Sequence, residues 1–251
     1  MRPRRRSSAA AGDGGRPSTE RASVLTFSAL PPKIRATDAG SPGSALRRAP
    51  RFLAIGDLST LGGEAAWPRW IDRLATAGVD ALQVREKAMS DRDLHRLVER
   101  TVRHAAGRLR VVVNGRADIA LAADADGVHL PSTGVPVAAL RDLDLVIGRS
   151  CHSIAEVEQA ASEGADYVTF GPLHPTPSKR GAGPPPGPGG LRRAAAVGLP
   201  VLALGGVTST DAMALAAACG AAGVAGIRAF QTDGLASFVA AGRACFAEAT
   251  G

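Results

Sequence analysis

The sequence predicts an α/β fold, a (β/α)8 TIM barrel over residues 51–251, preceded by a disordered basic tail over residues 1–50. Three observations predict the barrel. Short apolar runs of strand length recur eight times after Arg51, helical stretches separate them, and the connections are long enough for parallel crossovers. A doubly wound open sheet is the alternative, but no GxGxxG motif follows the first apolar run.

The first fifty residues differ from the rest in composition and charge. Residues 1–23 are rich in Arg, Ser, Gly and Pro, so they cannot bury enough apolar surface to offset their conformational entropy. Residues 1–51 hold 11 basic and 3 acidic side chains, whereas residues 52–251 hold 19 and 20. Because the net charge of +7 comes from the tail, we expect no nucleic-acid partner for the body. A dispensable segment, a targeting segment and an arm for an acidic partner stay open as roles of the tail.

Eight apolar runs are the predicted strands. In chain order they are Phe52–Gly56, Asp80–Val84, Arg110–Asn114, Asp126–Leu130, Leu145–Arg149, Asp166–Phe170, Pro200–Leu204 and Gly223–Ile227. The stretches between them have helical patterns, for example residues 91–106 and 153–165. Ser153 and Glu156 predict a capping box at the start of the second of these helices. Glycines are expected to close four helices by adopting the left-handed conformation, at Gly78, Gly164, Gly198 and Gly220.

The carboxyl ends of the strands form the active site in barrels of this type. The second predicted strand ends in the run from Gln83 to Lys87, in which alternation places Gln83, Arg85 and Lys87 on one side. Glu86 is left to support or neutralise the two cations. An amide and two cations suit a phosphorylated anion, and a solvated surface run is the alternative.

The third, fourth and fifth strands deliver further polar groups. They are Asn114, His129, Ser150 and His152. Asn114 and Ser150 are candidate substrate-binding residues. His152 is a candidate general acid or base because imidazole titrates near neutral pH, and an incidental loop histidine is the alternative.

A long Gly/Pro-rich stretch follows the sixth strand, from Gly171 to Gly190, and we expect it to close over substrate. Within it, Thr176, Ser178 and Lys179 offer two hydroxyls and a cation to an anionic group. A plain surface loop is the alternative.

The last two strands end where barrels of this type commonly bind phosphate through bare backbone N–H groups. The seventh strand is followed by Gly205 and Gly206, and the eighth runs toward Arg228. These three residues are candidate phosphate ligands.

Six short motifs, in this order and spacing, resemble those of the thiamine phosphate synthase/thiazole tautomerase (TenI-type) family. They are the segments 83–87, 126–130, 164–168, 170–172, 175–179 and 204–207, and the resemblance extends from about Arg51 to Phe246. It implies a TIM barrel, a role in thiamine biosynthesis, and small phosphorylated thiazole and pyrimidine compounds as substrates.

The resemblance implies one of two reactions. Synthases join hydroxymethylpyrimidine diphosphate to thiazole phosphate, release pyrophosphate and use Mg²⁺. Their two metal-binding aspartates correspond here to Gly115 and to a position within residues 131–134, Pro-Ser-Thr-Gly. Because Mg²⁺ normally takes one or two carboxylates, these departures favour the sister reaction. That reaction is a tautomerisation, in which a proton moves within a thiazole carboxylate phosphate.

For the tautomerase, the resemblance implies His152 as the proton carrier, the strand-seven glycines as phosphate ligands, and neither a cofactor nor a metal site. Mg²⁺ enters only with the synthase alternative, toward which Gln83, Thr176 and Lys179 point as groups that contact a diphosphate. Arg228 stands where both branches have Ser, and it either binds phosphate as a fork or blocks the site. The second case leaves a non-catalytic, phosphate-binding regulator as a third hypothesis.

The remaining features point to a cytoplasmic protein. Three widely spaced cysteines match no zinc pattern and are expected to be reduced thiols. No apolar run approaches the roughly 20 residues that a membrane-spanning helix needs, so we expect no membrane partner. A homo-oligomer stays open.

Overall fold

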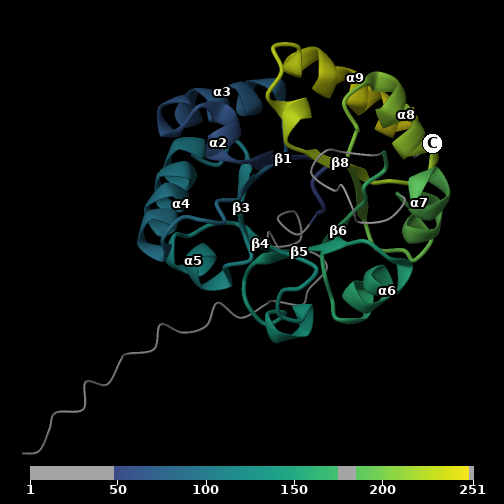
Figure 1. The fold of residues 1–251 in the computed structure, drawn as a ribbon, viewed down its shortest axis with the longest axis horizontal. Coiled ribbons are helices and arrows are strands. Elements are labelled where there is room, and N and C mark those ends of the chain that lie inside the picture. Colours follow the sequence, from purple (N-terminus) through teal and green to yellow (C-terminus); the bar gives the residue numbers. More distant parts are fainter. Residues whose placement is uncertain (1–47, 175–184, 249–251) are drawn as a thin grey trace, which may run out of the picture. The chain divides into compact units, whose positions relative to one another are not determined.

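The computed structural model describes residues 48–174 and 185–248, and these contain the predicted barrel. Eight parallel strands form a closed sheet in chain order, with β8 paired to β1 and the helices outside (Figure 1). The strands are β1 (Phe52–Gly56), β2 (Ala81–Val84), β3 (Arg110–Asn114), β4 (Gly127–Leu130), β5 (Val146–Cys151), β6 (Tyr167–Phe170), β7 (Val201–Leu204) and β8 (Gly223–Gly226). The predicted disordered tail covers residues 1–50, and residues 1–47 of it lie outside the described residues.

The predicted strands agree with the observed ones to within one or two residues. The prediction began five strands one residue too early, at Leu145, at Pro200 and at three aspartates, Asp80, Asp126 and Asp166, each of which lies just before an even-numbered strand. It also ended the fifth strand too early, since β5 continues through Ser150 to Cys151.

The three strand-start aspartates, Asp80, Asp126 and Asp166, each bind the strand that precedes their own along the barrel. Their carboxylates accept hydrogen bonds from the backbone N–H groups of Phe52 at 2.8 Å, Val111 at 2.7 Å and Ile147 at 2.7 Å. The backbone N–H of each aspartate donates back to the carbonyl of the same partner. Strand pairing therefore starts at the aspartate, with one side-chain and one main-chain bond.

The helices and short 3₁₀ turns connect successive strands around the barrel. The α-helices are α2 (Leu58–Leu61), α3 (Trp67–Ala77), α4 (Asp91–Ala105), α5 (Ala117–Ala122), α6 (Ile154–Ser162), α7 (Gly187–Ala195), α8 (Thr210–Ala218) and α9 (Leu235–Glu248). The 3₁₀ turns are η1 (Glu64–Ala66), η2 (Val137–Ala139) and η4 (Arg228–Phe230). The capping box of α6 is confirmed, with Ser153 and Glu156 bonded reciprocally. The four glycines expected to close helices all have positive φ.

The start of α7 corrects the expectation of a loop as far as Gly190. Residues 187–190, Gly-Pro-Gly-Gly, form the first turn of α7. Pro188 fits there because its fixed φ suits a first helical turn, where its missing N–H has no partner to lose. A side chain at Gly190 would place its Cβ 2.6 Å from the Cβ of Pro186, so close packing also favours glycine.

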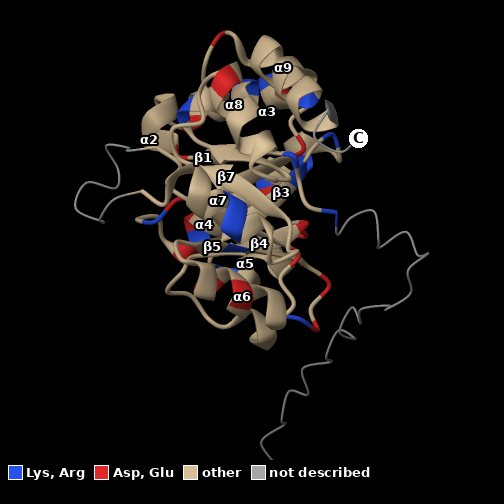
Figure 2. Ribbon diagram, turned by 90° about the vertical axis from the view of Figure 1, so that its right-hand side faces the viewer, with Lys and Arg blue, Asp and Glu red and all other residues tan. Residues whose placement is uncertain are grey.

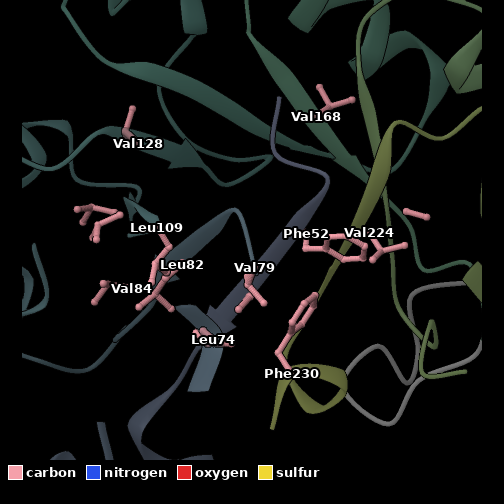
Figure 3. Packing of buried hydrophobic residues seen from close by; sticks show 14 of the residues in the cluster. Phe52, Leu74, Val79, Leu82, Val84, Leu109, Val128, Val168, Val224 and Phe230 are labelled. Atoms are coloured by element: carbon pink, nitrogen blue, oxygen red, sulfur yellow. The ribbon is translucent and has the colours of Figure 1, made fainter. Parts of the chain in front are cut away.

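The two faces of the barrel wall build two apolar clusters. The cluster on the interior face contains Leu53, Ile55, Ala81, Val112, Val146, Tyr167, Leu202 and Ala225. Residues that alternate with these point outward and pack under the helices in a larger cluster. Phe52 and Val224, at paired positions of β1 and β8, lie side by side in this outer cluster (Figure 3).

Two tryptophans of α3 anchor that helix to the barrel. The Cβ of a side chain at Gly56, the last residue of β1, would lie 2.3 Å from the Trp67 ring, so glycine is required for this packing. The indole N–H of Trp67 donates to Thr101 Oγ1 at 2.8 Å, and that of Trp70 donates to the Phe230 carbonyl at 2.8 Å. Both buried donors are therefore satisfied.

Over the described ranges, Figure 2 shows Lys and Arg interspersed with Asp and Glu. Exposed ion pairs such as Arg100 with Glu64 contribute to this mixture. Among the helices of these ranges, none has the length and apolar character to cross a membrane.

Candidate active site

The carboxyl ends of β2 to β6 bring several of the predicted site residues to one end of the barrel. The strand register pairs Asn114 with His129, and Ser150 with Thr169. Gln83 is the second-last residue of β2, and Asn114 is the last residue of β3. Because all strands are parallel, these side chains share the C-terminal end of the barrel.

Gln83 is the most informative of these residues. It shares the interior face of β2 with Ala81 and is only 2% exposed. Its Nε2 has no hydrogen-bond partner among the described residues. A buried amide N–H without a partner is costly, and a ligand oxygen would remove this cost.

Arg85 and Lys87 lie beyond the end of β2 at Val84, so strand alternation does not place them as the sequence analysis assumed. Arg85 is half-buried and Lys87 is exposed. Glu86 binds the β1–α2 connection, since its carboxylate accepts a hydrogen bond from the Leu58 N–H at 2.5 Å. Burial raises the pKa of Glu86, against the smaller opposing effect of that hydrogen bond.

His129 occupies the barrel interior behind Ser150. Its Nε2 lies 3.0 Å from Ser150 Oγ and 3.4 Å from Thr169 Oγ1, and its Nδ1 lies 3.1 Å from the Tyr167 hydroxyl. Burial, with a smaller contribution from the charge of Arg149, lowers the pKa of His129 to about 3. The imidazole is therefore neutral near pH 7.

His152 follows β5 directly and is exposed. Its Nδ1–H donates to the Gly171 carbonyl at 2.8 Å, so Nε2 carries the ring lone pair in the neutral form. The Glu156 carboxylate accepts hydrogen bonds from the backbone N–H groups of His152 and Ser153. The helix start thus fixes the main chain at His152, and the Gly171 bond fixes its ring.

Gly205 and Gly206 follow β7 with φ of 90° and 77°. The segment after β6 crosses them closely, because the His174 N–H donates to the Gly205 carbonyl at 3.1 Å. A Cβ at Gly206 would lie 2.6 Å from the Cβ of His174. This contact explains glycine at 206 even without a ligand. Arg228, the first residue of η4, is exposed.

Three predicted site residues, Thr176, Ser178 and Lys179, lie outside the described residues, as does half of the loop expected to close over substrate, residues 175–184. Residues 48–174 and 185–248 include no group of three or more His, Cys, Asp or Glu side chains that could hold a metal ion. Gly134 lies in a tight turn, with its N–H 2.8 Å from the Pro131 carbonyl. Arg149 holds the same loop through the carbonyls of Ser132 and Val135.

Tyr167 and Thr169 are functional candidates that were not predicted from the sequence. Both are buried on the interior face of β6, where they contact His129. Period-two alternation in the run from Asp166 to Phe170 puts their hydroxyls on one side, and this signal was available from the sequence.

Comparisons with known proteins give a consistent result. The family model described as thiamine monophosphate synthase matches residues 57–230. The chain is 43% identical to thiamine-phosphate synthase of Chlorobium luteolum over 165 residues, which cover 63% of this chain and 77% of that protein. It is 43% identical over 169 residues to thiamine-phosphate synthase of Methanoculleus marisnigri, covering 64% and 79%. The structure of thiamine phosphate pyrophosphorylase from Pyrococcus furiosus matches with a TM-score of 0.70 and 27% identity, covering 82% of this chain and 100% of that one.

Proposed function

Since this chain belongs to the thiamine monophosphate synthase family, we propose that it is a transferase that makes thiamine phosphate. In the proposed reaction, hydroxymethylpyrimidine diphosphate loses pyrophosphate, and its methylene carbon forms a new bond to the nitrogen of thiazole phosphate. The observation that carries this choice is that relatives at 43% identity bear the name thiamine-phosphate synthase. It favours the synthase over the tautomerase, which was the leading hypothesis from the sequence.

The geometry supports a substrate site at the C-terminal end of the barrel. Gln83 Nε2, which has no partner among residues 48–174 and 185–248, offers a buried donor. The half-buried Ser150 hydroxyl and Asn114 amide lie at the same end of the barrel. Arg85 and Lys87 follow the end of β2 and would add positive charge for the diphosphate. Charge that develops on the leaving pyrophosphate would be stabilised by these donors, with no need for them to reorganise.

We further propose that Gly205, Gly206 and Arg228 bind the phosphate of the thiazole substrate. Thr176 and Lys179 are assigned to the diphosphate because the resemblance implies it, and Ser178 stays a candidate ligand of an anionic group. Glycine N–H groups admit close approach of phosphate oxygens, and the guanidinium of Arg228 adds a planar fork at a position with ample solvent access.

Mg²⁺ is the metal that a synthase of this family implies, and the described residues do not fit it as a protein-built site. Gly115 and the segment 131–134, which holds no acidic residue, stand where the resemblance places aspartates, and no acidic cluster replaces them within the described ranges. A Mg²⁺ ion arriving with the diphosphate would depend on substrate oxygens and water for most of its ligands.

A second candidate function rests on His152. Its ring is oriented by the hydrogen bond to Gly171, and an imidazole can act as the general acid or base that a thiazole tautomerase needs. This hypothesis requires no metal.

The test supplies the purified full-length chain with both synthase substrates, with Mg²⁺ and separately with EDTA, and measures thiamine phosphate and pyrophosphate. Equal amounts of the two products support the proposal. A parallel reaction follows the thiazole carboxylate phosphate tautomers, with His152→Ala as the variant. Tautomer exchange without thiamine phosphate would replace the proposal with the second candidate, and binding of thiazole phosphate without turnover of either kind would identify a regulator.

A further inference from the structure

A chain of polar contacts crosses the barrel interior from β6 through β4 to β5. It joins the Tyr167 hydroxyl, the two ring nitrogens of His129 and the Ser150 hydroxyl. Tyr167 is 0% exposed and His129 is 2% exposed, so water does not compete for these groups. Ser150 is half-buried and stands at the C-terminal end of the barrel. The chain of contacts therefore leads from the core to the proposed substrate site.

The position of the ring hydrogen on His129 follows from Tyr167. Within the described ranges, the partner of the Tyr167 hydroxyl is His129 Nδ1, at 3.1 Å. A buried phenol O–H needs an acceptor, and Nδ1 accepts only if it carries no hydrogen. The ring hydrogen of the neutral imidazole then lies on Nε2.

The tautomer of His129 sets the direction of its hydrogen bond with Ser150. With its hydrogen on Nε2, His129 donates to Ser150 Oγ at 3.0 Å, and Thr169 Oγ1 at 3.4 Å is the longer alternative. A hydroxyl that accepts a hydrogen bond keeps its own hydrogen for donation. Ser150 thus has its O–H available for an acceptor beyond the protein interior.

The barrel makes room for this arrangement at Gly148. A Cβ there would lie 2.3 Å from Tyr167 Cζ and 2.6 Å from His129 Nδ1. Gly148 is the register partner of both His129 and Tyr167, on the strand between them. The missing side chain lets the tyrosine ring reach across β5 to the histidine.

We propose that Tyr167 and His129 are positioning residues that fix Ser150 as a hydrogen-bond donor to a phosphate oxygen of the substrate. The choice of a phosphate ligand rests on the proposed function, whereas the tautomer and the direction of donation do not. Neither residue needs to touch substrate. A neutral imidazole provides the orientation without adding charge or a second donor at the phosphate.

The first test reads the tautomer directly. Full-length protein labelled with ¹⁵N-histidine is expected to show the His129 hydrogen on Nε2, identified by comparison with His129→Gln. Tyr167 is the only tyrosine of the chain, so Tyr167→Phe removes a single phenol. Without the phenol, His129 Nδ1 no longer has to accept a hydrogen bond, so this variant is expected to populate the Nδ1–H tautomer of His129. A wild-type hydrogen on Nδ1 would overturn the proposal.

The second test asks whether Tyr167 acts through Ser150. Binding of inorganic pyrophosphate and, where turnover is measured, kcat are compared for Tyr167→Phe, Ser150→Ala and the double variant. Each single variant is expected to lose roughly tenfold, as for one hydrogen bond to a charged group, and the double variant should lose no more than Ser150→Ala. If the fold-loss of the double variant equals the product of the two single fold-losses, the result contradicts the proposal.

A matched control separates positioning from general destabilisation. Thr101→Val removes the buried hydrogen bond between Thr101 of α4 and Trp67 of α3, two helices that hold none of the three residues of the polar contacts. It should lower stability but leave the His129 tautomer and pyrophosphate affinity unchanged. Because the tautomer and pyrophosphate readouts need no turnover, failure of the synthase assay would not conceal failure of this proposal.

Discussion

Asp166 and Ile147 exchange two hydrogen bonds at the start of the β5–β6 pairing. The carboxylate of Asp166 accepts the Ile147 N–H at 2.7 Å, and the Asp166 N–H donates to the Ile147 carbonyl at 2.9 Å. Asp80 and Asp126 make the same exchange with β1 and β3. Aspartate side chains thus stabilise strand pairing at the N-terminal end of the barrel, and the proposed substrate site lies at the other end.

Asp166→Ala is expected to lower the free energy of unfolding by about 2 kcal/mol, because the Ile147 N–H loses a charged acceptor. Asp166→Asn keeps an oxygen acceptor and should lose less. Chemical denaturation measures both. Asp142→Ala is the control, since its side chain is 93% exposed and should change stability little. Equal stability of Asp166→Ala and Asp142→Ala would contradict the assigned role.

Gly148→Ala is expected to cost about 1 to 3 kcal/mol through overpacking against Tyr167 and His129. Thermal unfolding would show the loss, and the double variant Gly148→Ala/Tyr167→Leu should recover part of it because the ring is gone. Alanine at Gly189, where a Cβ meets nothing within 4 Å, is the matched control. No recovery in the double variant would mean that the ring is not the obstacle.

The stability of the protein should fall as pH falls from 6.5 toward 3, in part because of His129. Its folded-state pKa of about 3 lies below the value of 6.5 for an unperturbed histidine, so in this window the unfolded chain binds the extra proton. The contribution is up to about 1 kcal/mol per pH unit. His129→Gln should have a shallower pH dependence, and Tyr167→Phe should keep the wild-type slope because His129 stays buried. Parallel curves for wild type and His129→Gln would contradict this assignment.

Arg85→Ala should reduce synthase kcat/KM on the order of 100-fold, because a cation facing the leaving pyrophosphate is lost. Initial rates of thiamine phosphate formation provide the measurement. Arg92, exposed on α4, gives the matched control, and Arg92→Ala should retain wild-type rates. If the two variants behave alike, Arg85 does not contact the diphosphate.

Much of the fold could be predicted from the sequence because each strand is a separate apolar run with a helical stretch after it. Five strand starts were placed one residue early, and three of these fell on Asp80, Asp126 and Asp166. A pattern of apolar residues does not reveal that these side chains bind the backbone of the preceding strand. The first turn of α7 was missed for a related reason. Gly and Pro normally interrupt helices, and the close contact with Pro186 that favours glycine at position 190 is visible only in the folded structure.

The candidate site could be predicted only in part. Gln83, Asn114, Ser150 and His152 were found because polar groups at strand ends are conspicuous. Alternation could not place Arg85 and Lys87, which lie after the strand. The contact of Tyr167 with His129 depends on the stagger of three strands and on an absent side chain at Gly148, and neither follows from local pattern.

Gly148 also restricts how this sequence can drift over evolutionary time. Positions 148 and 167 share one space, so a side chain gained at the first is costly while the ring remains at the second. Loss of the ring removes this cost but also gives up the phenol. The two positions are therefore expected to vary together among related sequences.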